Sequence, residues 1–384
     1  MSRRSSNSAQ MLLTRARQSE ARMLEQLETL VKIESPSDDK AAVDRAVAQV
    51  ADWANALGGR VRLHRYTDSG DSLEARFGPL HGRAGPVLLL GHLDTVWDHG
   101  TLKRIPWRVT RDRISGPGVL DMKAGVVMML TAISLLAETG GVEHPIVILL
   151  HGDEEVGSHA SRKLTETIAR QSNAVYVLEP AQGKAGAYKT ARKGVGQYRL
   201  EVQGVAAHSG VDFSSGHSAV LELARQVEEI SKITDLARGI TVNAGVIGGG
   251  TRSNVIAAEA WAEIDARIAR RPDGVRVERA LRRLRPRDKA CKLLLTGEWN
   301  RPPMERSAGT VALFRRAQHL AAEMGFALEE ASTGGGSDGN FTAALGIPTL
   351  DGMGAVGSGA HALSEHCLRQ QLAPRTALLA AMVQ

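Results

Sequence analysis

The chain contains few cysteines and few aromatic residues, and no apolar run in it approaches the length of a transmembrane span. Cys291 and Cys367 have no spacing typical of a metal site or a disulfide, so we expect ordinary thiols in a reducing compartment. Aromatic residues make up only 4% of the 384 residues, so the core has to be built from alanine, valine, leucine and isoleucine. The basic N-terminal segment has no apolar stretch long enough for a signal peptide. These absences predict a cytoplasmic protein that does not act in a membrane.

The net charge is +6, from 48 basic and 42 acidic residues, and much of the excess lies between residues 267 and 292. A nucleic-acid surface is one interpretation of this segment. We favour a helix with a solvated basic face, because aromatic stacking partners are absent. The glycine runs at 248–250 and 334–336 lack the Lys-Ser/Thr of a phosphate-binding P-loop. The sequence therefore predicts no nucleic-acid partner.

Three short apolar runs, at residues 86–90, 146–150 and 174–178, are typical of buried parallel strands. Helical stretches lie between and around them. Helices are expected at 8–33, 41–57, 122–136 and 308–324. The fold class predicted from this alternation is α/β, with a mostly parallel sheet flanked by helices.

After residue 192 the pattern changes to alternating strands, which indicates an inserted domain. The expected order is β-α-β-β-α-β, as in ferredoxin-like α+β domains. The elements are expected at 196–202, 218–234, 241–247, 258–268, 274–284 and 292–295. We predict a catalytic domain in two parts, residues 1–192 and 301–384, around an inserted domain at 193–300.

Acidic and imidazole side chains stand at the ends of the predicted strands. His92 and Asp94 follow the first run, Glu154 and Glu155 follow the second, and Glu179 follows the third. Ligands of parallel sheets gather outside the carboxyl ends of the strands. We therefore expect these side chains to lie close together.

Two further candidates complete the set. Asp121 directly precedes the apolar helix expected at 122–136, and His361 closes the segment GSGAH. Carboxylates and imidazoles are the ligands of divalent metals such as zinc. Two histidines and three carboxylates are enough for two metals that share one bridging ligand, and one glutamate is then left to transfer protons.

Each of these features alone has an ordinary structural interpretation. A single H-x-D motif is weak evidence for a metal site, and acidic residues after a strand often only complement the dipole of the helix that follows. A strand that ends in Glu-Pro is weaker still. Buried strand ends rarely carry unpaired carboxylates, however, because burying a charge is costly. Three such ends in succession need a shared cation, so the set predicts a hydrolase with two metal ions.

These residues lie in segments that resemble a known family. The matching segments are GHLDTVW, GPGVLDMKAG, GDEEVGS, LEP, RKGVGQYRLEVQGVAAHSG, TRSNVIAAEAWAEIDAR, TGGGSDGNF and GSGAH. The chain resembles the co-catalytic zinc peptidases that include bacterial glutamate carboxypeptidase of the folate-cleaving type, acetylornithine deacetylase and succinyl-diaminopimelate desuccinylase. Within this family, its segments most resemble those of the glutamate carboxypeptidase branch.

The resemblance implies a role for each residue of the set. Two zinc ions per chain would hold a water that attacks an amide carbonyl, with Glu154 as general base. Asp94 would orient His92 from behind the metal. The implied zinc ligands are His92, Asp121, Glu155, Glu179 and His361.

The resemblance also implies a homodimer, with the inserted domain as lid and dimerisation domain. His208, in AAHSG, would reach the partner's active site and stabilise the oxyanion. Arg267 would recognise a carboxylate on the substrate, and Arg301 a second one. The implied substrate-binding residues are Asn254, Arg267, Arg301, Gly335 and Gly336.

Some residues beside the ligands depart from the family pattern, namely Asp98, His99 and His159. They bear on substrate details and not on the chemistry. Three functions stay open: an exopeptidase that cuts next to a free carboxylate, an N-acyl amino-acid deacylase, and a binding relative without metals. No ligand position is lost, which disfavours the last. The substrate expected in the first two cases is a small molecule or short peptide with a free carboxylate.

Overall fold

The computed structural model describes residues 3–79 and 85–384, which form two compact units. The first unit runs to Ala191 and resumes with Arg306–Thr333 and Ser337–Gln384. The second unit comprises Arg192–Glu305 together with Gly334–Gly336. The second unit thus extends five residues beyond the boundary expected at residue 300, and it takes in three glycines from the later part of the chain.

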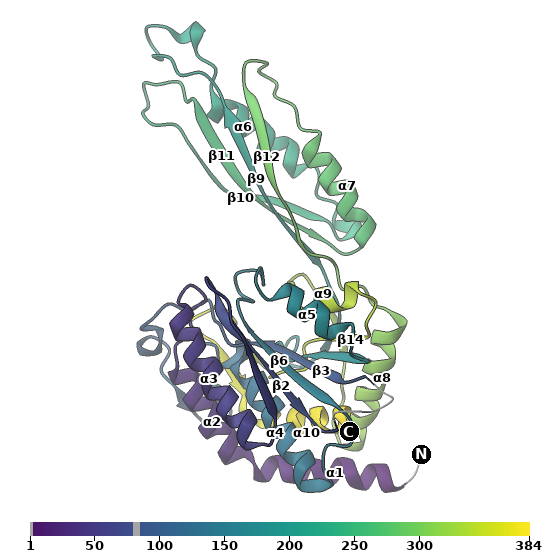
Figure 1. Ribbon diagram of the computed structural model, residues 1–384. Coiled ribbons are helices and arrows are strands. Elements are labelled where there is room, and N and C mark those ends of the chain that lie inside the picture. Colours follow the sequence, from purple (N-terminus) through teal and green to yellow (C-terminus); the bar gives the residue numbers. More distant parts are fainter. Residues whose placement is uncertain (1–2, 80–84) are drawn as a thin grey trace. The chain divides into compact units, whose positions relative to one another are not determined.

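The first unit is built on a six-stranded sheet with the order β1-β2-β6-β3-β7-β14 (Figure 1). Strands β6, β3, β7 and β14 are parallel, whereas β1 and β2 are antiparallel to their neighbours. The bounds are β1 Arg60–His64, β2 Gly70–Phe77, β3 Val87–His92, β6 Ile146–Gly152, β7 Ala174–Val177 and β14 Thr349–Leu350. The three apolar runs form β3, β6 and β7, so the predicted α/β fold with a mostly parallel sheet is confirmed.

Helices surround this sheet. They are α1 Arg3–Gln18, α2 Glu20–Lys32, α3 Lys40–Ala56, α4 Ala124–Thr139, α5 Arg162–Ala169, α8 Ala308–Glu323, α9 Gly339–Ala344 and α10 Arg369–Val383. Those near 41–57, 122–136 and 308–324 were expected, whereas α5, α9 and α10 were not. The single helix predicted at 8–33 was wrong, because the chain turns at Ser19 between α1 and α2. The Ser19 hydroxyl donates to the Arg15 carbonyl at 3.0 Å, a local hydrogen bond that is known to bend helices.

The helix predicted from residue 122 begins two residues later, at Ala124. Asp121 and Met122 have non-helical backbone angles within the turn Val119–Lys123, and the peptide bond between them is cis. Contrary to the expectation from the sequence, the stretch Val119–Thr139 is long and apolar enough to cross a membrane. Most of it is buried inside the protein, however. Helix α4 is therefore a core helix of the first unit.

Two small sheets complete the first unit and support its loops. Strand β8 (Tyr188–Arg192) pairs with β13 (Glu330–Thr333). A second sheet has the order β15-β16-β5-β4. Its bounds are β4 Arg108–Val109, β5 Arg113–Ser115, β15 Gly357–Ser358 and β16 His366–Leu368. The loop between β15 and β16 carries His361.

The second unit has the predicted β-α-β-β-α-β order, and each strand pair in its sheet is antiparallel. The sheet order is β10-β11-β9-β12. The elements are β9 Gly194–Gln203, α6 Ala219–Ser231, β10 Thr241–Gly249, β11 Glu259–Ile268, α7 Arg271–Arg282 and β12 Lys292–Arg301. Strand β12 is longer than predicted because it continues through Gly297, where it has a positive φ of 106°. A glycine weakens a strand pattern in a sequence.

Candidate metal centre

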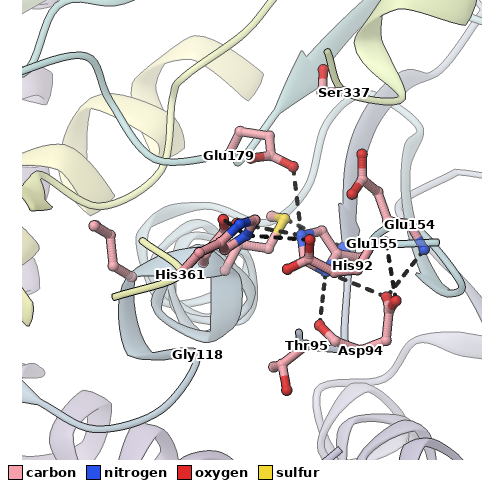
Figure 2. Close-up of polar contacts among 12 residues, drawn as sticks. His92, Asp94, Thr95, Gly118, Glu154, Glu155, Glu179, Ser337 and His361 are labelled. Carbon is pink, nitrogen blue, oxygen red and sulfur yellow. Dashed lines mark hydrogen bonds and ion pairs between the residues drawn. The ribbon is translucent and has the colours of Figure 1, made fainter. Parts of the chain in front are cut away.

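The strand ends bring the predicted ligands together at one edge of the six-stranded sheet (Figure 2). Strands β3 and β6 are adjacent and parallel, with His92 opposite His151. Glu155 lies three residues beyond the end of β6, and Glu179 lies two residues beyond the end of β7. Because the three strands run in register, their carboxyl ends deliver these side chains to the same place.

Five side chains form two groups of donors that share Asp121. In the first, His92 Nε2 lies 3.5 Å from Asp121 Oδ1 and 3.5 Å from Glu179 Oε1. In the second, His361 Nε2 lies 3.2 Å from Asp121 Oδ2 and 3.3 Å from Glu155 Oε2. Within each group, the donor atoms all lie within 4.8 Å of one another. All five residues predicted as metal ligands are therefore in these two groups.

The spacing of these atoms fits metal ligation better than direct hydrogen bonding. Atoms bound to one tetrahedral zinc at about 2.0–2.1 Å lie about 3.3–3.4 Å from one another. Good N–H···O hydrogen bonds are shorter, at about 2.9–3.0 Å. Within the described residues, three buried atoms of the site have no hydrogen-bond partner: His92 Nε2, Asp121 Oδ1 and Glu155 Oε1. The donor set consists of imidazoles and carboxylates, which suits zinc.

The close approach of carboxylates and imidazoles also determines which groups carry protons when no metal is bound. Burial opposes a charge on His92, but the nearby carboxylates of Asp121, Asp94 and Glu179 raise its pKa well above the usual value. Asp121 and Glu155 raise the pKa of His361 to about 10. Without a metal, the two imidazoles therefore hold protons that balance the carboxylates. Metal binding has to displace these protons, so metal affinity falls as the pH falls.

Asp94 is fully buried, and it contacts both His92 and the loop that carries Glu154 and Glu155. Its main-chain oxygen lies 3.0 Å from His92 Nδ1, and its Oδ1 lies 3.4 Å from the same atom. Its carboxylate accepts the backbone N–H groups of Glu154, at 3.2 Å, and of Glu155, at 3.1 Å. An imidazole that is held at Nδ1 presents Nε2 to a metal. Asp94 therefore has the contacts of a residue that orients His92.

Two supporting residues were missed in the sequence analysis. Ser37 donates its hydroxyl to Asp94 Oδ2 at 2.7 Å. Glu365 accepts the backbone N–H of Asp121 at 3.1 Å. Ser37 had no signal beyond the turn Ser35-Pro36-Ser37. Glu365 was visible as an acid four residues after His361, but a sequence does not show that such an acid is buried.

The expected substrate-binding residues lie in the second unit. Arg267 is the last residue but one of β11. Its Nε and Nη2 donate to Asp265 at 2.7–3.0 Å, and its Nη1 lies 3.5 Å from the Gly334 oxygen. The carbonyl oxygens of Gly335 and Gly336 accept N–H groups of Arg192 at 3.2 and 3.0 Å.

Arg301 ends β12 and is buried close to the same glycine loop. Its Nη1 donates to Asn300 Oδ1 at 2.9 Å. A Cβ added at Gly336 would lie 3.0 Å from Arg301 Cδ, so the loop packs directly on this side chain. Arg267, Arg301 and the glycine loop are thus neighbours within the second unit.

His208 and Asn254 lie beyond the other end of the same sheet. His208 pairs with Val255, next to Asn254, and its Nδ1 accepts the N–H groups of Gly210 and Val211 at 3.1 and 3.2 Å. A ring nitrogen that accepts hydrogen bonds carries no proton, so the neutral ring carries its proton at Nε2 and can donate there.

The length of strand β11 alone puts a wide separation between Arg267 at one end of the sheet and His208 and Asn254 beyond the other end. From Glu259 to Arg267 the strand advances by eight residue-to-residue steps, which is roughly 26 Å at about 3.3 Å per step. The pairing continues past Glu259, away from Arg267, and reaches His208 opposite Val255, next to Asn254. Within one copy of the second unit, His208 and Asn254 therefore lie far from Arg267.

The residues that depart from the expected pattern do not join either donor group. His99 Nε2 pairs with Asp39 Oδ2 at 2.9 Å, and both side chains are exposed. Asp98 accepts the Thr101 N–H with its carbonyl oxygen. His159 has an exposed side chain. Within the described residues, the donor groups consist only of the five predicted ligands.

Comparisons with known proteins agree with this geometry. The model of peptidase family M20/M25/M40 matches residues 88–384. Carboxypeptidase G2 from Pseudomonas sp. (strain RS-16) is 30% identical over 369 residues, which cover 94% of this chain and 88% of that protein.

Solved structures show the same fold. Aminopeptidase PepT from Bacillus cereus ATCC 10987 has a TM-score of 0.78 at 20% identity, over 95% of this chain and 98% of that chain. Human carnosine dipeptidase 1 has a TM-score of 0.74 at 17% identity, over 98% of both chains. At these identities the structures establish the fold alone. The match to the family model and the match to carboxypeptidase G2 carry the assignment further: the chain belongs to peptidase family M20/M25/M40 and is an enzyme of the metallopeptidase class.

Proposed function

We propose that the protein is a zinc-dependent hydrolase that cleaves an amide bond next to a free carboxylate, in the manner of a glutamate carboxypeptidase. The observation that carries this proposal is the pair of donor groups that share Asp121 at ligand spacing. The similarity to carboxypeptidase G2 over nearly the whole chain supports an exopeptidase that acts at a carboxyl end. We place the reaction in the cytoplasm.

Two zinc ions per chain suit this donor set. His92, Asp121 and Glu179 would hold one ion, and Asp121, Glu155 and His361 the other. When bound, such ions lower the pKa of water and polarise a carbonyl oxygen. Asp121 is the only carboxylate in both groups, so it is the bridging ligand in this proposal.

Glu154 is the proposed general base. It is adjacent to the ligand Glu155, and the two backbone N–H groups are fixed on the two oxygens of Asp94, at 3.2 and 3.1 Å (Figure 2). Neighbouring carboxylates with different surroundings take different roles. Glu154 accepts a proton from the attacking water and passes it to the leaving amine.

Arg267 is the proposed recognition group for the substrate carboxylate. Asp265 occupies the Nε and Nη2 side of the guanidinium, which fixes its plane. The Nη1 group beside the Gly334 oxygen remains for a substrate carboxylate, with Arg301 and the loop of Gly335 and Gly336 as neighbours. A planar guanidinium discriminates carboxylates from amides through its fixed donors.

We further propose a homodimer in which His208 and Asn254 act on the partner's active site. The distance of roughly 26 Å along β11 separates them from Arg267 in one copy, which supports a second copy as their source in the active site. The proton on His208 Nε2 would then stabilise the developing oxyanion.

A substrate screen tests the function directly. Zinc-loaded protein is assayed against dipeptides, folate, acyl-glutamates and other N-acylated amino acids. Preferred cleavage of folate or peptides with a C-terminal glutamate supports the carboxypeptidase. Preferred release of acetyl or succinyl groups would instead make the protein an N-acyl amino-acid deacylase, and no cleavage of any amide would refute both.

Removal of Asp121 is expected to empty both zinc positions. Elemental analysis of protein purified without chelators should give up to two zinc ions per chain, and Asp121→Ala should lose most of both. Glu74→Gln is the matched control, because Glu74 is buried in the same sheet but pairs with His64 and Arg76. Full metal content in Asp121→Ala would refute the shared ligand.

Glu154→Gln is expected to keep zinc while turnover falls by about two orders of magnitude or more, the usual scale for a lost general base. The amide keeps the shape of the side chain but cannot accept the proton. Elemental analysis and steady-state kinetics on the same preparation separate the two effects. A rate near that of the wild type would remove Glu154 from this role.

Action of His208 on the partner is expected to show in mixed dimers. His208→Ala and Glu154→Gln chains are each inactive alone, whereas a hybrid has one site with both residues intact. Mixing the two should restore part of the activity, in step with subunit exchange followed by differently tagged chains. If the chains exchange and no activity returns, His208 does not act in trans.

Substitution of Arg267 by lysine is expected to reduce kcat/KM for an acyl amino acid far more than for the corresponding amide. Lysine keeps the charge but loses the planar donors. Arg199→Lys is the matched control, since Arg199 lies in the neighbouring strand and pairs with Glu201 and Glu263. Equal losses for acid and amide substrates would contradict carboxylate recognition by Arg267.

A further inference from the structure

A fully buried carboxylate lies beside the metal ligands without belonging to either donor group. Glu365 is 0% exposed, and it lies four residues after His361 in the loop between β15 and β16. The loop is closed by hydrogen bonds from Ala362 N to the Gly359 oxygen, at 2.8 Å, and from Glu365 N to the Ala362 oxygen, at 2.9 Å. His361 and Glu365 are therefore held at a fixed spacing in one short loop.

The Glu365 carboxylate receives four hydrogen bonds from two other segments of the chain. Oε1 accepts the N–H groups of Leu120 at 2.8 Å and Asp121 at 3.1 Å. Oε2 accepts the N–H of Gly118 at 2.9 Å and the indole N–H of Trp97 at 2.8 Å. A carboxylate has about four acceptor positions, so these donors use its full capacity.

Three of these donors belong to the turn that carries Asp121. The N–H groups at the start of a helical segment have no carbonyl partner within it, and here Glu365 supplies the partner. The same turn has non-helical backbone angles at Asp121, with φ −111° and ψ 94°. An external acceptor is thus what keeps the Asp121 backbone in this orientation.

The contacts join two ligands of the second donor group. Glu365 is linked to His361 through its own loop and to Asp121 through the backbone hydrogen bond, while His361 Nε2 and Asp121 Oδ2 lie 3.2 Å apart. We propose that Glu365 is a positioning residue that fixes Asp121 relative to His361, so that the group of Asp121, Glu155 and His361 is assembled before a metal binds. This inference rests on the ligand set of the proposed function.

The test is a titration of metal-free protein with zinc alone, followed by calorimetry, for wild type and Glu365→Gln. The glutamine has nearly the same volume, but its NH2 group would face two N–H donors in either orientation of the amide. We expect at least about tenfold weaker binding of one zinc equivalent, the scale typical of residues that orient metal ligands. Thermal unfolding of the same metal-free samples establishes that the protein measured is folded.

Two further variants separate positioning from general stability. Glu34→Gln is the matched control, because Glu34 also accepts two backbone N–H groups, from Gly100 at 2.9 Å and Leu102 at 2.8 Å, without touching a ligand. It should lower the unfolding temperature of the metal-free protein and leave zinc affinity unchanged. If Glu365→Gln does not fold, Glu365→Asp carries the test, because it keeps the charge but is too short for all four donors.

The proposal is overturned if folded Glu365 variants bind both zinc equivalents as tightly as the wild type, or if Glu34→Gln weakens zinc binding equally. The titration needs no turnover. A protein that binds two zinc ions but cleaves no amide would therefore refute the proposed function and leave the role of Glu365 standing.

Discussion

The carboxylate of Asp121 lies between two imidazoles, and the whole site depends on this shared position. Its two oxygens lie 3.5 Å from His92 Nε2 and 3.2 Å from His361 Nε2. Three carboxylates in so small and buried a space cannot all be charged without cations nearby. Protons on the imidazoles supply that charge in the metal-free protein, and divalent ions supply it better because they bind all members of a group at once. The buried carboxylates of the site therefore require positive charge for the fold to be stable, and bound metal ions supply that charge.

The ligands reach this position in two different ways. His92 ends β3, and Glu155 and Glu179 follow the parallel strands β6 and β7, so the register of these strands brings all three to one edge. Asp121 and His361 come from a turn and a hairpin loop, whose backbones are not fixed by that sheet. Such segments need side-chain hydrogen bonds to hold them, which explains why a buried carboxylate lies between them and why its loss should affect one metal position more than the other.

The same distinction decides how much the sequence could predict. The strand-end ligands were found because apolar runs identify buried strands, and the topology of parallel strands then brings the residues at their carboxyl ends to one edge of the sheet. The backbone of Asp121 was not predicted, because a turn with non-helical angles before an apolar helix leaves no periodic pattern; the helix was expected two residues too early for this reason. Ser37 and Glu365 were missed because burial of a polar side chain is a tertiary property. The last six of the ten residues of β12 were missed, since Gly297 interrupts the strand pattern in the sequence.

The candidate functional residues of the two units differ in charge. The donor groups of the first unit contain three carboxylates, which would repel a substrate carboxylate until metals are bound. The second unit instead gathers Arg192, Arg267 and Arg301 around the glycine loop. Planar guanidinium groups suit a carboxylate ligand, because they present fixed pairs of donors. In the proposed reaction, selectivity for substrates with a free carboxylate would therefore come from the arginines of the second unit and not from the donor groups, whose own carboxylates repel a second anion.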